Sequence, residues 1–216
     1  MSTTTLVMGR SGAGKSRSLL NLDPSSSFLI AAMRKPLPFK GWRSKWVECT
    51  AENKKGNFVI TDDAEKVRAY LVRISEARPE IKTIVIDDSQ YIMANEFMRC
   101  ATEKGYEKFT RIGQGFWLIV MEASKLRDDL TVVFLHHEDT DESGEVHAKT
   151  IGKMLDDKIT LEGMFTIVLR AAKRDGKHVF LTTNGGKDTV KAPEGMFSQP
   201  EIENDLNLVL DAIHSY

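Results

Sequence analysis

One octapeptide near the start of this 216-residue chain constrains its fold more than any other feature. Residues 9–16, Gly-Arg-Ser-Gly-Ala-Gly-Lys-Ser, match the phosphate-loop pattern G-x-x-x-x-G-K-[ST] without a departure. A β-rich run, residues 3–8, comes before the loop, and residues 16–22 read as a helix up to the Asp23-Pro24 break. A strand, a glycine-rich turn and a helix in this order predict an α/β fold with a phosphate site where the helix begins.

The residue types in this loop suit phosphate binding. Glycines let the backbone turn its N–H groups inward, so that they and the helix N-terminus surround an anion. Lys15 adds a positive charge with a catalytic role, and the Ser16 hydroxyl is placed to bind Mg²⁺ beside ATP. The predicted nucleotide-binding set is Gly9, Arg10, Ser11, Gly12, Ala13, Gly14, Lys15, Ser16 and Arg17.

A second motif delivers a carboxylate to the same edge of the predicted sheet. Ile84-Val85-Ile86-Asp87 is an apolar run of the kind found in buried parallel strands, and it ends in an acid. We therefore expect Asp87 to bind Mg²⁺ together with Ser16. The next residue, Asp88, points elsewhere, and two roles stay open for it: polarising the attacking water or capping the following helix.

Two histidines follow the next apolar run, residues 131–135, which is expected beside the strand of Asp87. A polar side chain there could contact the γ-phosphate or the water. We include His136 in the catalytic set, although the sequence does not distinguish it from His137. The alternative is a hydrogen-bonded core histidine, and because adjacent strand residues face opposite sides, a metal shared by the pair is not expected.

The rest of the chain predicts one α/β domain over residues 1–216, with a mostly parallel sheet flanked by helices. A glycine-containing loop is expected at 139–149, and a C-terminal hairpin about Asp175-Gly176. Further strands are expected at 27–33, 57–61, 83–86, 164–169 and 178–182, and helices at about 63–77, 91–104 and 114–128. A capping box, Ser198 with Glu201, is expected to precede a closing amphipathic helix.

Residues 34–55 are locally basic in a chain whose net charge is −1. The stretch contains seven lysines and arginines but only two glutamates, which gives it a local net charge of +5. Phe39, Trp42 and Trp46 lie among these charged residues. Proteins that bind single-stranded DNA use positive charges to contact the DNA backbone and aromatic rings to stack on the bases. The alternative interpretation is a loop whose tryptophans pack on the core while its lysines stay in solvent. Lys149 and Lys153 are a second candidate DNA contact.

Composition excludes several other classes. With 41% hydrophobic and 28% charged residues, the chain is neither disordered nor fibrous. Two cysteines, Cys49 and Cys100, cannot form a disulfide framework and favour a reducing compartment, the cytoplasm. The longest apolar run, residues 28–33, is far below the roughly 20 residues that span a bilayer, so no membrane segment is expected.

Together with the phosphate loop, several segments give the chain a resemblance to the short RecA-like ATP-binding proteins of bacteriophages. These are Ile86-Asp87-Asp88-Ser89, Lys35-Pro36-Leu37-Pro38-Phe39-Lys40, His136-His137-Glu138, Thr150-Ile151-Gly152-Lys153 and Asn204-Asp205-Leu206. The resemblance implies a RecA-type core and an oligomeric Mg·ATP-dependent ATPase that assists single-strand annealing in phage recombination. Single-stranded DNA and a single-strand binding or annealing protein are the implied partners, in the cytoplasm of the host.

One departure from RecA-type recombinases concerns the residue that activates water. Those proteins place a glutamate near the end of the strand after the phosphate-loop helix, whereas this strand ends Ala31-Ala32-Met33-Arg34. Glu48 folding back, or Asp88, could substitute, and slow hydrolysis is expected. The alternative function is a nucleotide-gated binding or assembly factor without direct action on DNA; a small-molecule kinase is disfavoured because Arg170 and Arg174 are too sparse for a substrate site.

Overall fold

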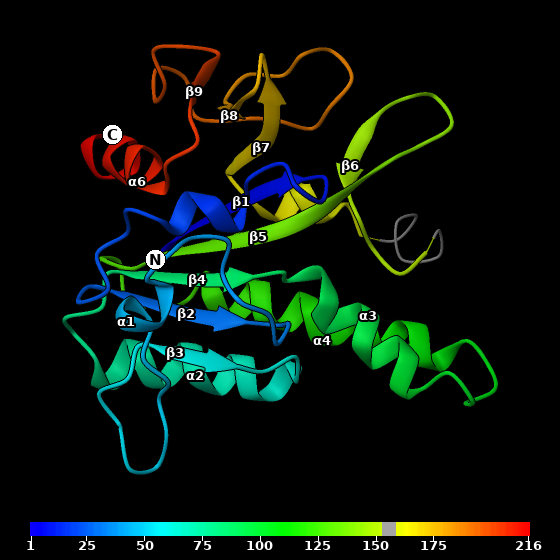
Figure 1. Ribbon diagram of the computed structural model, residues 1–216. Coiled ribbons are helices and arrows are strands. Elements are labelled where there is room, and N and C mark those ends of the chain that lie inside the picture. The colour runs from blue at the N-terminus through cyan, green and yellow to red at the C-terminus, as the bar shows by residue number, and fades with distance from the viewer. Residues whose placement is uncertain (153–158) are drawn as a thin grey trace.

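The computed structural model describes residues 1–152 and 159–216 (Figure 1). The strands are β1 (Thr3–Gly9), β2 (Ser27–Ala31), β3 (Phe58–Ile60), β4 (Thr83–Asp87), β5 (Thr131–Thr140), β6 (Val146–Ala148), β7 (Ile167–Arg174), β8 (Lys177–Leu181) and β9 (Glu201–Glu203). The α-helices are α1 (Trp42–Lys45), α2 (Ala64–Ala77), α3 (Gln90–Arg99), α4 (Glu107–Ala123) and α6 (Leu206–Ser215), and the 3₁₀ turns are η1 (Ser16–Leu19) and η2 (Leu161–Met164).

The described strands form one mixed sheet in the order β3-β2-β4-β5-β1-β7-β8-β9, with β6 paired to β5 alone. Neighbours from β3 to β7 run parallel, whereas β7, β8 and β9 are antiparallel. The phosphate-loop strand β1 is thus central, between β5 and β7, and β5 separates it from β4, the strand of Asp87. Because parallel strands share their carboxyl-end edge, the loops after β1, β4 and β5 meet there.

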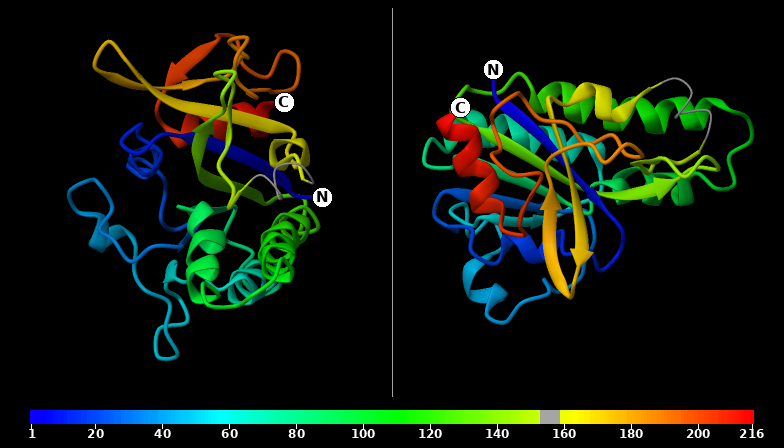
Figure 2. Two further views of the ribbon diagram at one scale, coloured as in Figure 1. Left: turned by 90° about the vertical axis from the view of Figure 1, so that its right-hand side faces the viewer. Right: turned by 90° about the horizontal axis from the view of Figure 1, so that it is seen from above.

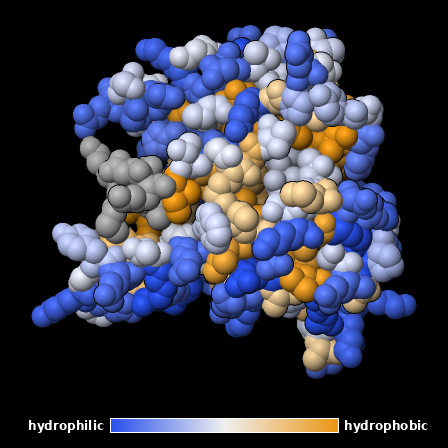
Figure 3. All heavy atoms as spheres, turned by 180° about the vertical axis from the view of Figure 1, so that it is seen from behind, coloured by the Kyte–Doolittle hydropathy of each residue, from blue (hydrophilic) through white to orange (hydrophobic). Residues whose placement is uncertain are grey.

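Two apolar clusters lie on opposite faces of the sheet. Buried side chains of α2, α3 and α4 join one cluster with alternate residues of β4 and β5, such as Ile84 and Phe134. The other cluster combines α6 and the segment after the phosphate loop with Val85 and Val133. Figure 2 shows α2 and α4 together on one side of the sheet. From behind, hydrophobic atoms gather toward the middle of the face inside a largely hydrophilic border (Figure 3).

Most predicted elements are confirmed. The predicted strands start within three residues of their expected positions, and helix 63–77 appears as α2. The hairpin turns at Asp175 and Gly176, both with positive φ as a two-residue turn requires. The sheet is mostly parallel, flanked by helices, and the chain closes with α6. No helix in the described parts of the chain is long and apolar enough to cross a membrane.

Several boundaries were predicted wrongly. Residues 16–22 form only the four-residue turn η1, in which the Ser18 hydroxyl donates to the Lys15 carbonyl at 2.6 Å and competes with helical backbone bonding. The loop at 139–149 is instead the end of β5 turning back as β6. Helices expected at 91–104 and 114–128 are α3 and α4, which begin and end earlier.

The capping box at Ser198 and Glu201 was also wrong. Glu201 begins strand β9, which extends the antiparallel sheet from β8. The side chain that caps α6 is Asp205, which accepts a bond from the Asn207 N–H at 3.0 Å.

Candidate nucleotide-binding site

A pocket of about 390 Å³ opens at the carboxyl edge of the sheet. Six residues of the phosphate loop and η1 line one wall: Ser11, Gly12, Gly14, Lys15, Ser16 and Arg17. The other lining residues come from four separate places in the sequence: Lys35, Pro36 and Pro38 after β2, Asp88 just after β4, His137 on β5, and His178 on β8. Gly9, Arg10 and Ala13 complete the loop behind this wall.

Lys15 lies against its own loop. Its ammonium donates to the carbonyls of Gly9 at 2.6 Å and Arg10 at 3.0 Å, and the residue is only 6% exposed. Burial lowers the pKa of Lys15 to about 8, against the opposing attraction of Asp88 and Asp87. The nearby carboxylates therefore offset only part of the cost of burying this positive charge.

Ser16, which lines the pocket, bonds to Asp87, which is buried behind it, and the sequence predicted these two residues as an Mg²⁺ pair. The Ser16 hydroxyl donates to Asp87 Oδ1 at 2.9 Å, although 71 residues separate them. Burial and the neighbouring Asp88 carboxylate raise the pKa of Asp87 to about 6, and the Ser16 bond opposes that rise. A hydroxyl and a buried carboxylate are hard oxygen donors, so these two residues fit Mg²⁺ together with phosphate oxygens.

Asp88 faces the pocket rather than capping α3. Its backbone is left-handed, φ 57°, which turns the side chain away from that of Asp87. One carboxylate oxygen pairs with Lys35, and the other lies 3.5 Å from His137 Nε2. Burial raises the pKa of Asp88, but His137 and Lys35 outweigh it and hold the pKa below its usual value. No side chain caps α3, so the capping role expected for Asp88 was wrong, and its water-polarising role stays a prediction.

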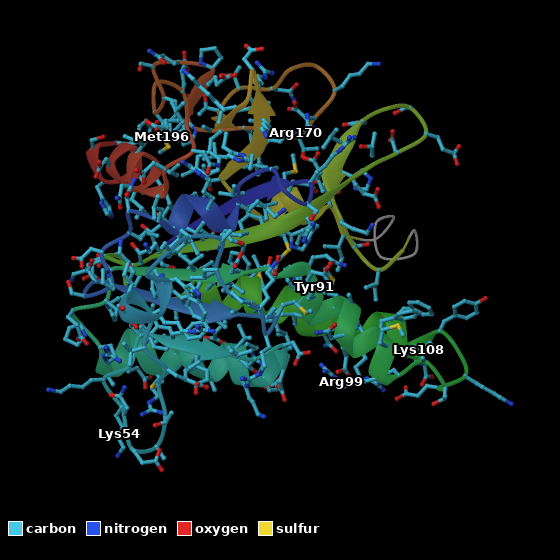
Figure 4. All side chains as sticks on the ribbon, in the orientation of Figure 1. Lys54, Tyr91, Arg99, Lys108, Arg170 and Met196 are labelled. Atoms are coloured by element: carbon cyan, nitrogen blue, oxygen red, sulfur yellow. The ribbon has the colours of Figure 1, made fainter. Side chains whose placement is uncertain are left out.

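The two histidines have different environments. His136 is fully buried, its Nε2 donating to the Lys149 carbonyl and its Nδ1 accepting from Ser89, each at 2.8 Å. Burial lowers the pKa of His136 to about 4, so the ring is neutral near pH 7. Its two hydrogen bonds hold it in the core, away from the pocket. His137 instead lines the pocket, edge-on to Tyr91 at 5.6 Å between ring centroids; Figure 4 labels Tyr91 near the carboxyl ends of the strands.

Glu48 is not brought to the pocket. It pairs with Phe58 at the amino end of β3, whereas the pocket lies at the carboxyl edge of the same parallel strands. Glu48 is also exposed. Of the two carboxylates considered as a base, the structure therefore places only Asp88 within reach of the pocket.

The C-terminal hairpin supports the phosphate loop, which the sequence did not indicate. His178 on β8 donates its Nδ1–H to the Ala13 carbonyl at 2.9 Å. Gly14 has φ +105°, and a Cβ there would lie 2.9 Å from His178 Nδ1 and 3.1 Å from Asn204 Oδ1. Only glycine fits at Gly14, for backbone and for space. A histidine 165 residues away has no local signal that could have revealed this contact.

The basic stretch 34–55 does not form one surface. Trp46 is 2% exposed and belongs to the core, so its proposed stacking on a base was wrong. Trp42 is half-buried, edge-on to Phe58, with the Arg43 guanidinium 5.1 Å above its ring. Lys54 lies at the tip of a separate loop at the lower left (Figure 4). Lys149 pairs with Asp139 at 3.3 Å, and Lys153 lies outside the described residues.

A carboxylate that the sequence analysis did not single out lies beside the loop. Glu138, at the end of β5, accepts two bonds from Arg170 at 2.8 and 2.9 Å, and Arg10 approaches it at 3.4 Å. Glu138 is also one of the charges that act on Lys15. Arg170, which could have suggested a substrate site, is thus committed to an internal pair.

Comparison with known proteins adds no relative. No protein-family model matches the chain, and no curated protein matches it in sequence. The function has to be inferred from the pocket itself.

Proposed function

We propose that this protein is a Mg·ATP-dependent phosphate-loop ATPase with a RecA-type core. The observation that carries the proposal is the bond between Ser16 and Asp87. It brings the last residue of the phosphate loop to a buried carboxylate two strands away, at the edge where Lys15 and the glycines of the loop also lie. A hydroxyl, a carboxylate and a buried cation close to one pocket are groups that suit a nucleoside triphosphate with Mg²⁺. A loop that only joined a strand to a helix would not need them together.

The reaction that these residues support is attack of water on the γ-phosphate. The water oxygen bonds to phosphorus while the bond to the bridging β,γ-oxygen breaks, and the leaving oxygen becomes part of ADP. Bound Mg²⁺ supplies positive charge to the β- and γ-phosphates. Lys15 stabilises the same charge from the loop side, and Asp88, oriented by His137, accepts the proton from the water, which passes to the phosphate product.

Single-stranded DNA is the proposed macromolecular partner, and residues 37–43 are the proposed contact. They line an open depression of about 510 Å³ that shares Pro38 with the nucleotide pocket. Lys40 and Arg43 are exposed there, and Phe39 is half-buried. Positive charges and aromatic rings beside the nucleotide pocket support a DNA contact that changes when a nucleotide binds or leaves. The resemblance to phage RecA-like proteins adds recombination in the host cytoplasm, oligomer formation and an annealing partner to this proposal.

The low pKa of Asp88, which His137 lowers as well as Lys35, supports slow turnover in the absence of a partner, because a weakly basic carboxylate accepts a proton poorly. ATP hydrolysis should therefore be measured with and without single-stranded DNA. The ATPase proposal predicts Mg²⁺-dependent release of phosphate that DNA accelerates. A protein that binds ATP but never hydrolyses it, with or without DNA, would instead be the nucleotide-gated assembly factor.

A further inference from the structure

Lys35 lies on the wall of the pocket opposite the phosphate loop. It follows the turn after β2, and its side chain is 47% exposed, yet it reaches a carboxylate, Asp88, whose side chain is only 4% exposed. Lys35 is also one of the charges that act on Lys15. Two ammonium groups, from sequence positions 15 and 35, therefore approach the same space from opposite sides.

The charges around the pocket are uneven. Of the described residues that line it, Lys15, Arg17 and Lys35 are cationic, and only Asp88 carries a carboxylate. Asp88 would repel a terminal phosphate, since like charges destabilise each other strongly where solvent is excluded. Lys35 is the cation that pairs with Asp88 at the pocket wall in this arrangement.

We propose that Lys35 is a phosphate-contacting residue that exchanges Asp88 for the γ-phosphate of a bound nucleoside triphosphate. The inference rests on the proposed ATPase function and deepens it. A diphosphate lacks the group that would draw Lys35 away, so Lys35 stays on Asp88 when ADP is bound. Differential contact of this kind is what a ligand needs in order to shift a conformational equilibrium.

The exchange has two consequences. Asp88 loses its cationic partner only when a γ-phosphate is present, so it becomes a competent base at the moment that the substrate is bound. The segment that carries Lys35 also joins the pocket to the proposed DNA contact: Pro36 and Pro38 line the pocket, and Pro38 and Lys40 line the neighbouring depression. Nucleotide state is thereby relayed to the proposed DNA contact.

The test is calorimetric binding of ADP and of a non-hydrolysable ATP analogue, both with Mg²⁺, to the full chain. Lys35→Ala should weaken binding of the ATP analogue about tenfold or more, as loss of a charge-assisted bond does, and change ADP affinity less than about twofold. Lys35→Arg should keep most of the preference for the analogue. Lys66→Ala is the matched control, since Lys66 is an exposed lysine on α2 that lines neither the nucleotide pocket nor the depression of residues 37–43, and should leave both affinities unchanged.

Asp88→Asn provides a second measurement in case Lys35→Ala does not fold. It frees Lys35 without removing it, so affinity for the ATP analogue should rise while affinity for ADP stays the same. Equal effects of Lys35→Ala on both nucleotides, or no effect on either, overturn the role of Lys35 and leave the ATPase proposal intact. Absence of nucleotide binding by the unaltered protein overturns both.

Discussion

At the scale of single residues, the buried carboxylate of Asp87 beside the pocket is held at a cost to stability. Asp87 is 2% exposed and next to a second acid, so its pKa in the folded protein, about 6, lies above the ordinary value of 3.8. A raised pKa means that the folded state binds more protons than the unfolded state between these two values. Stability from this group is therefore present below about pH 4 and is lost as the pH rises through 6.

Replacing Asp87 by Asn should consequently stabilise the fold. At pH 7.5 we expect the free energy of unfolding to increase by about 1–3 kcal/mol, from a shift of roughly two pKa units at about 1.4 kcal/mol each, because the amide keeps the Ser16 bond without a buried charge. Urea denaturation measures the change. At pH 3.5 the two proteins should be equally stable; a variant less stable than its parent at pH 7.5 contradicts this description of the site.

The pKa of Lys15 predicts a pH dependence of nucleotide binding. Phosphate binds the protonated amine, whose pKa in the free protein is about 8, so affinity should be constant below that pH and fall above it. The expected slope is about tenfold per pH unit, one proton being taken up on binding. Titration calorimetry at pH 7, 8 and 9 measures it, with Lys15→Arg as the control whose charge does not titrate. An equally steep decline in that variant would assign the effect to another group.

At the scale of elements, the sequence predicted strands better than helices. Strands such as β4 and β5 are continuous apolar runs that end in polar residues, and burial on both faces requires that pattern. The start of α4 was missed because Gly113 and Gly115 weaken the helical pattern; in the fold, Gly115 lets α4 pack against Ala64 of α2. β9 was missed because three residues carry too little pattern to outweigh an apparent cap.

The segment 34–48 divides into two parts with different roles, which single substitutions can separate. Trp46 packs in the core, so Trp46→Ala should destabilise the fold by about 3–5 kcal/mol, as large-to-small core changes do. Lys40→Ala with Arg43→Ala should leave stability nearly unchanged and flatten the salt dependence of single-stranded DNA binding, since phosphate contacts set that slope. Denaturation and a DNA titration over a salt series distinguish these effects. DNA binding by the double variant that matches the parent at every salt concentration would place the contact elsewhere.

At the scale of the whole molecule, the candidate site is assembled from distant parts of the chain. The phosphate loop and Asp87 were predictable because each is a local pattern with a fixed place in an α/β sheet. Lys35 and His178 were not assigned to the pocket in advance, because their positions depend on how the chain after β2 and the C-terminal hairpin fold back over the loop. His137 was one of two histidines between which the sequence could not choose. Glu48 and His136 had suitable chemistry, but Glu48 lies at the opposite edge of the sheet and His136 is directed into the core.

The most direct test of the central proposal is a calorimetric titration of Mg·ATP into the protein and into Lys15→Ala. The unaltered chain should bind one nucleotide saturably. Lys15→Ala should retain the fold by circular dichroism, because the core lies elsewhere, yet bind at least about tenfold more weakly, since the loop loses a buried cation that faces the phosphates. A folded Lys15→Ala variant with undiminished affinity for Mg·ATP would contradict the assignment of residues 9–16 as the nucleotide site.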